Sequence, residues 1–388
     1  MATAARIDTP WLADPAVQAV CAALEAGGAK ALFVGGCVRN ALMGTGVRDI
    51  DICTDAVPER IIELTKAAGL KPVPTGIDHG TITVVSQGEG FEVTTFRRDV
   101  STDGRRAVVA FSTKVEEDAA RRDFTMNALY ARPDGWVLDP LGGLPDVRAR
   151  RVRFIGRATD RLREDYLRAL RYFRFLAWYG DPADGVDAEA LSAIAETLDG
   201  LALLSRERVG IEMHRLLEAP DPAPAVASMR SCGALTALLE GADDRALAPL
   251  IHLETEAGAK PDATRRLAAL GGVDLPESLR RPKAEIRRID RLRQGALEIQ
   301  NPVELGWRLQ DDAPDALLLR HALMETPLDP AALDAVERGR AAVFPVKAQD
   351  LMPDFRGAEL GAELDRLKTV WLDSGLTLTR DQLFARRT

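Results

Sequence analysis

The sequence predicts an α+β protein whose mixed α/β head is followed by an all-α remainder. In the first part, apolar strand-like segments alternate with segments of helical spacing. The strand segments are 31–34, 48–53, 81–85 and 91–96, and the helical ones are 13–27 and about 57–68. From about residue 156 the strand pattern stops, and stretches rich in Leu, Ala, Arg and Glu run almost to the end. The chain is therefore predicted to divide into an α/β head and an all-α remainder, with proline breaks among the later helices.

Composition indicates a soluble globular protein. The 388 residues are 46% hydrophobic and 28% charged, and no apolar run approaches the roughly 18 residues of a membrane helix. The N-terminus lacks the apolar core of a signal peptide, so we expect a cytoplasmic protein with no membrane partner. The four cysteines show no Cys-x-x-Cys spacing, which argues against a zinc site or a disulfide framework.

Charge is unevenly distributed along the chain. The net charge is −8, yet residues 97–174 hold 18 Lys and Arg against 12 Asp and Glu. A basic segment inside an acidic chain is suited to a local phosphate-binding surface. The alternative is a set of arginine-rich helices that face solvent.

A glycine turn followed by two aspartates predicts a metal and triphosphate site. Gly35 and Gly36 come directly after an apolar strand and before a helix, where the backbone can approach a ligand and helix N–H groups can meet phosphate oxygens. Asp49 and Asp51 are spaced i, i+2, so on a strand they share one face. Mg²⁺ lies about 2.1 Å from carboxylate oxygens and takes one or two carboxylates plus phosphates. Arg39 adds a charge. Neither a Gly-x-Gly-x-x-Gly fingerprint nor a P-loop is present.

A second group of polar residues recurs every three positions on an expected helix. It consists of Asp165, Arg168, Arg171 and Arg174. Cytosine and adenine both present an amine donor beside a ring-nitrogen acceptor, so an Asp that accepts and an Arg that donates would select C and A against U and G. The alternative is i, i+3 ion pairing on a solvated face.

With these residues in view, the chain resembles the class II CCA-adding tRNA nucleotidyltransferases and the related bacterial poly(A) polymerases. Four motifs carry the resemblance: PheValGlyGlyCysValArgAsn with ArgAspIleAspIle, ArgArgAspPheThrMetAsnAla, GluAspTyrLeuArgAlaLeuArg, and SerArgGluArgValGlyIleGluMetHisArgLeuLeu at 205–217. The resemblance is specific over residues 30–217. It implies a nucleotidyltransferase head with a polymerase-β-like palm at 1–150, a neck and body with the base-reading helix at 151–270, and an RNA-binding tail at 271–388.

The resemblance also implies roles for individual residues. Asp49 and Asp51 would be catalytic and hold Mg²⁺, and Glu92 is the candidate for a third catalytic carboxylate. The triphosphate would be contacted by Gly35, Gly36, Arg39 and Arg122. The incoming base and its phosphates would be contacted by Asp165, Arg168, Arg171 and Arg174. One departure is visible, because Asn40 stands where the family usually has Asp.

The implied reaction is attack of a tRNA 3′-hydroxyl on the α-phosphate of CTP or ATP, with release of pyrophosphate. The expected partners are tRNA, CTP and ATP, and the oligomeric state is left open. A basic segment in the helical half is expected to grip the RNA backbone: Arg280, Arg281, Lys283, Arg287, Arg288 and Arg291. Alternatives are a poly(A) polymerase using only ATP, an enzyme adding only CC or only A, and a non-catalytic RNA-binding module.

Overall fold

The computed structural model describes residues 5–102, 107–183, 185–352 and 354–386, with residues 99–102 and 107–109 as backbone only. The chain forms two compact units. Unit 1 comprises Met1–Val209 and Ser228–Leu238, and unit 2 comprises Gly210–Ala227 and Leu239–Thr388. The segment boundaries at 150 and 270, which the family resemblance implies, remain a prediction. Residues 103–106 of the basic segment lie outside the described residues.

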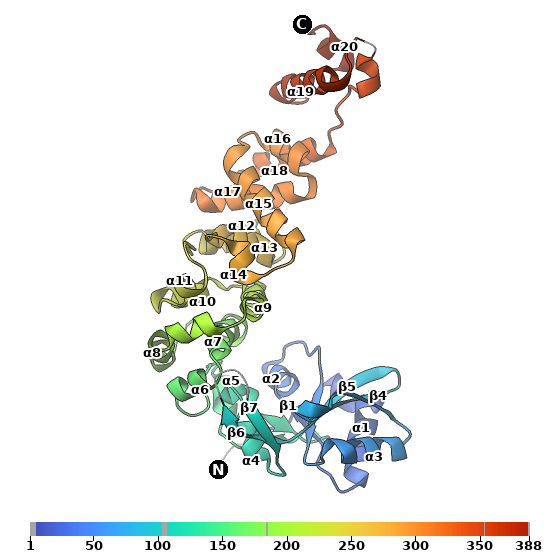
Figure 1. Cartoon of the computed structure of the whole chain (residues 1–388), viewed down its shortest axis with the longest axis vertical. Coiled ribbons are helices and arrows are strands. Elements are labelled where there is room, and N and C mark those ends of the chain that lie inside the picture. The colour runs from blue at the N-terminus through green and yellow to red at the C-terminus, as the bar shows by residue number, and fades with distance from the viewer. Residues whose placement is uncertain (1–4, 103–106, 184, 353, 387–388) are drawn as a thin grey trace. The chain divides into compact units, whose positions relative to one another are not determined.

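Unit 1 is built on a seven-stranded mixed sheet with the strand order β3-β4-β5-β2-β1-β8-β9 (Figure 1). A separate hairpin pairs β6 with β7. The strands are β1 (Leu32–Val34), β2 (Asp51–Thr54), β3 (Lys71–Gly76), β4 (Thr81–Ser86), β5 (Glu89–Thr95), β6 (Arg97–Thr102), β7 (Ala107–Phe111), β8 (Tyr130–Ala131) and β9 (Val137–Leu138). Among the strand pairs of the described residues, β2 and β5 alone run parallel, and their register places Asp51 opposite Glu92.

Helices cover the sheet and continue the unit beyond it. α1 and α3 pack against each other and against β4 and β5. The helices of unit 1 are α1 (Pro15–Ala26), α2 (Gly36–Met43), α3 (Pro58–Ala67), α4 (Val115–Ala120), α5 (Leu144–Arg148), α6 (Ala158–Glu164), α7 (Leu167–Tyr179), α8 (Ala188–Glu196) and α11 (Ala234–Leu238). Each of α1 and α3 begins with a proline at its first position, where the missing N–H costs nothing. α9 (Arg206–Leu217) and α10 (Ala223–Ser231) begin in one unit and end in the other.

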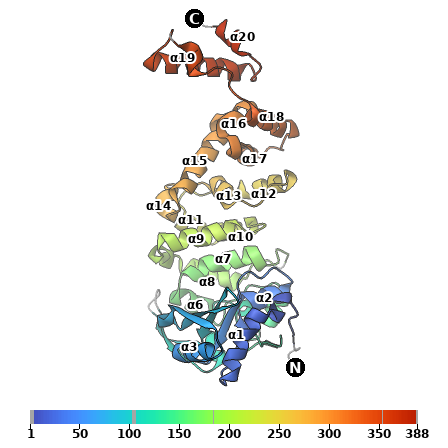
Figure 2. The same ribbon diagram turned by 90° about the vertical axis from the view of Figure 1, so that its right-hand side faces the viewer.

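Unit 2 consists of helices joined by loops, with no strand among its described residues. Its helices are α12 (Leu247–Glu256), α13 (Ala263–Leu270), α14 (Leu275–Leu279), α15 (Lys283–Glu298), α16 (Pro302–Leu309), α17 (Ala313–Leu323), α18 (Pro330–Ala341), α19 (Gly357–Asp373) and α20 (Arg380–Phe384). α12, α13, α15 and α17 pack on one another (Figure 2). Near the C-terminus, Leu351, Leu367 and Trp371 form part of a smaller apolar cluster. No helix in the described ranges is long and apolar enough to cross a membrane.

The predicted fold class is confirmed, since all strands in the described residues precede residue 139 and helices follow. Strand β3 was missed because its exposed sequence contains Pro72 and Pro74, which are tolerated at the edge of the sheet. One correction concerns the metal motif. β2 begins at Asp51, so Asp49 lies in the preceding loop, and the argument from a shared strand face applies to Asp51 alone.

Candidate active site

The glycine turn joins β1 to α2 in a conformation that requires glycine. Gly35 has φ +71° and ψ −119°, a region that residues with a Cβ rarely adopt. Its N–H donates to the carbonyl of Leu129 (3.1 Å), and its carbonyl accepts from the N–H of Arg39. The turn therefore brings main chain, rather than side chains, to the start of α2, which is the arrangement that a phosphate needs for close approach.

Arg122 provides the positive charge beside this turn. Its Nη1 lies 3.5 Å from the point that a Cβ on Gly35 would occupy. Its Nε donates to the hydroxyl of Tyr130 (3.1 Å), and its Nη2 donates to Asp118 (3.0 Å). Burial disfavours the charged guanidinium, but Tyr130 and Asp118 outweigh burial and raise the pKa of Arg122. The arginine is thus held rigid and charged, with Nη1 directed toward the turn.

Asp118 is the anchor of this arginine. The side chain is 1% exposed, and its carboxylate accepts from Arg122, from Arg121 (3.1 Å) and from the hydroxyl of Tyr130 (2.8 Å). Burial alone would raise the pKa of Asp118, but Arg122 and Arg121 outweigh it and lower the pKa to about 2. Sequence reasoning missed both Asp118 and Tyr130. The available signal was the position of Asp118 four residues before Arg122, a spacing that favours ion pairing where the chain is helical.

Arg39 lies beneath the glycine turn and is only 4% exposed. Its Nη2 is 3.8 Å from the point that a Cβ on Gly36 would occupy, and its guanidinium stacks 3.8 Å from the ring centroid of Tyr179. Nε (3.1 Å) and Nη2 (2.9 Å) both donate to Oδ1 of Asn40. Arg39 thus places a positive charge under the turn and links α2 to α7. Its predicted contact with a triphosphate stays a prediction.

Three residues link Arg39 to the predicted base-reading helix. Nη1 of Arg39 donates to Oδ1 of Asn127 (2.7 Å), and Nδ2 of Asn127 donates to Oδ1 of Asp123 (3.3 Å). Asp123 in turn accepts from Nε of Arg171 on α7 (2.7 Å). Burial opposes the charge on Asp123, but Arg171 outweighs burial and lowers the pKa of the carboxyl. The result is one chain of polar contacts from the glycine turn to α7.

The carboxylates of Asp49, Asp51 and Glu92 have no such partners. No hydrogen bond or ion pair within the described residues engages any of the three. Asp51 and Glu92 are register partners on adjacent parallel strands, so their Cα atoms are about 4.8 Å apart. Burial raises the pKa of Asp51, and the neighbouring charges of Glu92 and Asp49 raise it further, while Arg122 opposes the shift. Three neighbouring carboxylates without a cation are the donor set that a divalent metal ion favours.

The metal site is not preformed by protein ligands alone. Among the described residues, no three His, Cys, Asp or Glu side chains are arranged to hold a metal ion. This agrees with the chemistry of Mg²⁺, which is usually held by one or two carboxylates and completed by water and substrate phosphates. One or two of Asp49, Asp51 and Glu92, completed by water and phosphate oxygens, would therefore suffice to hold such an ion.

The predicted base-reading residues are divided between a helix and the gap before it. Asp165 is extended (φ −154°, ψ 105°) between α6 and α7, so it does not belong to the helical stripe. Its Oδ1 accepts from the N–H of Leu167 (3.1 Å), a capping role that Asp prefers to a helix interior. The expectation that Asp165 and Arg168 form a neighbouring pair on one helix is corrected accordingly.

Each of these two residues has another partner. Asp165 pairs with Nη2 of Arg208 (3.0 Å), whereas Arg168 pairs with Glu164 (2.5 Å) and donates to the carbonyl of Arg161 (2.9 Å). Sequence reasoning missed Glu164 and Arg208. Glu164 stands four residues before Arg168, a spacing that favours ion pairing on a helix. On α7, the guanidinium of Arg174 stacks 5.2 Å from the ring centroid of Phe175.

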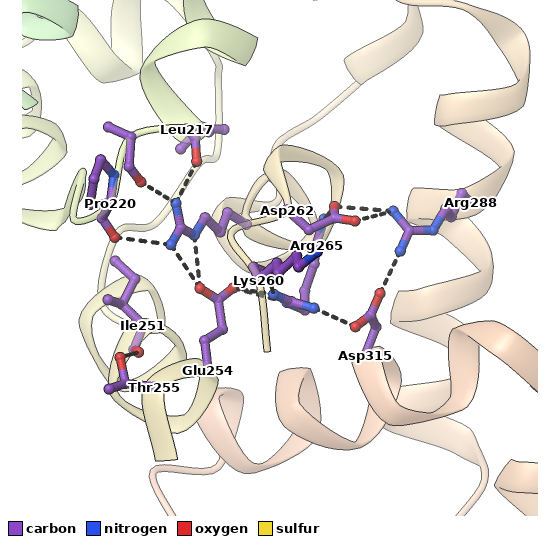
Figure 3. Close-up of polar contacts among 12 residues, drawn as sticks. Leu217, Pro220, Ile251, Glu254, Thr255, Lys260, Asp262, Arg265, Arg288 and Asp315 are labelled. Carbon is purple, nitrogen blue, oxygen red and sulfur yellow. Dashed lines mark hydrogen bonds and ion pairs between the residues drawn. The ribbon is translucent and has the colours of Figure 1, made fainter. Parts of the chain in front are cut away.

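In unit 2, the predicted RNA-binding residues fall into two groups. Arg288 bridges three carboxylates: Asp262 (2.8 Å), Asp312 (2.7 Å) and Asp315, and Figure 3 shows its contacts with Asp262 and Asp315. The other paired members are Arg291 with Asp312, Arg281 with Glu285, and Arg280 with Glu277. By contrast, Lys283 and Arg287 are exposed, and the described residues offer them no carboxylate. These two remain the members best placed to meet RNA.

A cavity of about 440 Å³ in unit 1 lies away from the glycine turn. It is lined by Arg150, Arg151, Val152, Tyr172, Leu176, Gly185, Val186 and Asp187. None of the predicted nucleotide-binding residues contributes to its wall, so it does not coincide with the candidate site.

Comparison with known proteins identifies the family of the chain. The family model of the poly A polymerase head domain matches residues 31–153, and that of the probable RNA and SrmB-binding site of polymerase A matches residues 185–245. The turn, Arg122 and the three carboxylates all lie in the first match. A mixed-sheet head with these groups defines a nucleotidyltransferase.

Relatives narrow the class. The mouse mitochondrial CCA tRNA nucleotidyltransferase 1 is 31% identical over 381 residues, which cover 91% of this chain and 85% of that protein. The CCA-adding enzyme of Leuconostoc mesenteroides is 41% identical over 202 residues, covering 52% of this chain and 49% of its own length. The crystal structure of Bacillus stearothermophilus CCA-adding enzyme in complex with CTP aligns with a TM-score of 0.68 and 26% identity, over 93% of this chain and 94% of that one. The chain belongs to the family of CCA-adding tRNA nucleotidyltransferases.

Proposed function

We propose that this enzyme adds C, C and A to the 3′ end of tRNA, using CTP and ATP and releasing pyrophosphate. The observation that carries the proposal is the placement of three unpaired carboxylates, Asp49, Asp51 and Glu92, near a glycine turn that is flanked by Arg122. Names of relatives support the substrates: one is a CCA tRNA nucleotidyltransferase, and another was crystallised with CTP.

Transfer requires the triphosphate to be held while its α-phosphate meets the tRNA 3′-hydroxyl. The main chain at Gly35 and Gly36 would approach the phosphates, and Nη1 of Arg122 would donate to one of their oxygens. Negative charge on the leaving pyrophosphate increases as the bond to the α-phosphate breaks, so donors fixed in advance stabilise the transition state. Because Asp118 and Tyr130 hold Arg122 in place, little reorganisation is needed during the reaction.

A divalent metal would be held by Asp51, Glu92 and Asp49, and we propose Mg²⁺. When bound, it would neutralise phosphate charge and lower the barrier to deprotonation of the attacking hydroxyl. The raised pKa of Asp51 fits this role: burial and then the neighbouring charges of Glu92 and Asp49 disfavour its ionised form, and a bound cation would relieve both.

Selection of C and A would fall to Asp165 and Arg168. The carboxylate would accept from the exocyclic amine and the guanidinium would donate to the ring nitrogen, which U and G cannot match. In the present structure Arg168 is bound to Glu164, so its use on a base implies an exchange of partners. Cytoplasmic location stays a prediction, and the mouse relative is named mitochondrial.

The proposal is tested with three RNAs and four separate nucleoside triphosphates. The RNAs are a tRNA ending before its CCA, a tRNA ending in CC, and an unrelated RNA. We expect CTP to extend the first by two nucleotides and ATP to extend the second by one. Long ATP tracts on all three RNAs would identify a poly(A) polymerase instead, and no extension of any RNA would contradict a catalytic function.

A further inference from the structure

The carboxylate of Asp165 lies in a short gap between two helices. α6 ends at Glu164 and α7 begins at Leu167, so only Asp165 and Tyr166 connect them. The ring of Tyr166 packs directly on the backbone of Gly200 in the 3-10 helix Leu198–Leu203, where an added Cβ would lie 2.1 Å from it. The main chain of the gap is therefore fixed from one side, and the direction of the Asp165 side chain depends on other contacts.

Arg208 supplies the remaining contact. Its Nη2 donates to both oxygens of Asp165, at 3.0 Å from Oδ2 and 3.3 Å from Oδ1. Arg208 belongs to the first turns of α9, in the part of that helix that lies in unit 1. The side chain of Arg208 is 36% exposed and that of Asp165 is 29% exposed, so the pair is accessible to a ligand. Charge-assisted contacts of this kind fix geometry as well as charge.

The remaining acceptor capacity of Asp165 is defined by these contacts. A carboxylate has about four lone-pair positions. Oδ1 accepts from Leu167 N–H and from Arg208, whereas Oδ2 accepts from Arg208 alone. Within the described residues, Oδ2 thus keeps an acceptor position for a further donor.

We propose that Arg208 is a positioning residue for base selection, which holds Asp165 so that Oδ2 accepts the exocyclic amine of cytosine or adenine. This rests on the proposed function, since it assumes that Asp165 reads the base. Without Arg208, only the N–H of Leu167 restrains the carboxylate, and a rotated carboxylate discriminates less between an amine and a carbonyl. Arg168, which has Glu164 as its own partner, is not affected directly.

The test is a four-nucleotide competition on a tRNA that ends before its CCA. For Asp165→Ala we expect the selectivity for CTP over UTP to fall roughly 10- to 100-fold, the range of one good bidentate base contact. Arg208→Ala should lower it by about tenfold, because the carboxylate remains but is less well oriented. Arg208→Lys, which keeps the charge, should recover part of that selectivity.

Two further measurements separate positioning from general damage. The value of kcat/KM for CTP should fall while that for UTP stays constant, whereas a merely destabilised protein would lose both alike. In addition, the double variant Asp165→Ala/Arg208→Ala should be no less selective than Asp165→Ala alone, because residues acting through one contact are not additive. Arg206→Ala, two residues away on α9 and without a hydrogen bond or ion pair in the described residues, is the matched control.

The outcomes distinguish the two hypotheses. If the wild-type protein does not prefer CTP and ATP, the proposed function fails. If the wild type is selective, two results would show that Arg208 has no positioning role. One is full selectivity in both Arg208→Ala and Arg208→Lys; the other is a double variant that is clearly less selective than Asp165→Ala.

Discussion

Replacing Arg288 should destabilise unit 2 rather than weaken RNA binding. The guanidinium bridges Asp262, Asp312 and Asp315 across three segments of unit 2, and the side chain is 25% exposed. Figure 3 shows the contacts with Asp262 and Asp315. Removing one partner of a fully buried pair costs about 3–5 kcal/mol. Here Asp315 keeps Arg265 and Asp312 keeps Arg291. We therefore expect Arg288→Ala to lower the free energy of unfolding by about 2 kcal/mol, less than that buried limit.

Thermal denaturation measures this cost. For a unit of 150–250 residues, each kcal/mol shifts Tm by about 2–4 °C, so the expected decrease is about 4–8 °C. The matched control is Arg287→Ala, one residue earlier on α15, which removes an exposed arginine without a carboxylate partner and should leave Tm within about 1 °C. Equal Tm values for the two variants would refute the assignment of Arg288 to the fold.

For RNA binding we expect the opposite ranking: Arg287, whose loss should hardly change Tm, should matter for tRNA affinity. Neutralising Arg287 together with Lys283 should raise Kd for all tRNAs alike and reduce the slope of log Kd against log salt concentration by about one for each phosphate that is no longer neutralised. Binding of free CTP should not change. If this pair of substitutions leaves the salt slope unaltered, the RNA surface lies elsewhere in the chain.

Other substitutions test the catalytic unit. Asp51→Asn should abolish transfer yet raise Tm slightly in metal-free buffer. Because the pKa of Asp51 is raised in the folded protein, its ionised form lowers the free energy of unfolding at pH values above the ordinary pKa of Asp. Asn carries no charge and so removes this destabilisation. Glu92→Gln should reduce turnover, whereas Glu89→Gln on the same strand, which faces the other side, should not; equal activities would remove Glu92 from the site. The pKa of Asp118 is lowered to about 2. Its ionised form therefore adds about 2 kcal/mol to the free energy of unfolding above pH 4, and this contribution is lost as the pH falls through 2. The difference in unfolding free energy between wild type and Asp118→Asn should therefore narrow with acid in urea titrations. Asn40→Ala should cost about 1–3 kcal/mol by leaving Nε and Nη2 of Arg39 without their acceptor, while Asn40→Asp should retain the fold; equal urea midpoints would refute this.

Local pattern was sufficient for much of the head. Residues 31–34, 81–85 and 91–96 were predicted as strands and appear within two residues of those bounds, because an apolar or alternating run is a direct consequence of burial. The two-residue strands β8 and β9 are too short to have a period, and they exist because β1 offers an edge to pair with. Their formation is decided by tertiary contact rather than by their own sequence.

The candidate site was predicted residue by residue, but its pairings were not. The spacing of Asp165 and Arg168, and the family motif that contains Arg122, made these residues candidates, and their roles stay predictions. The partner of Asp165 is Arg208, 43 residues away in the sequence. No spacing rule for a single helix or strand links residues so far apart, so the pair becomes visible only in the fold.

Asn40 shows why the pairings decide the chemistry. From sequence alone, Asn in place of Asp indicates the loss of a charge near the triphosphate. In the structure its Oδ1 accepts from Nε and Nη2 of the buried Arg39, while its Nδ2 donates to the carbonyl of Gly46 (2.9 Å). An acceptor is what this position needs, and Asn provides one together with a donor that a carboxylate lacks. Asn in place of Asp at position 40 is therefore accommodated by the carbonyl of Gly46, which accepts from Nδ2. Because Asn40 is neutral, it does not offset the positive charge of Arg39 under the glycine turn, and that charge can attract phosphate.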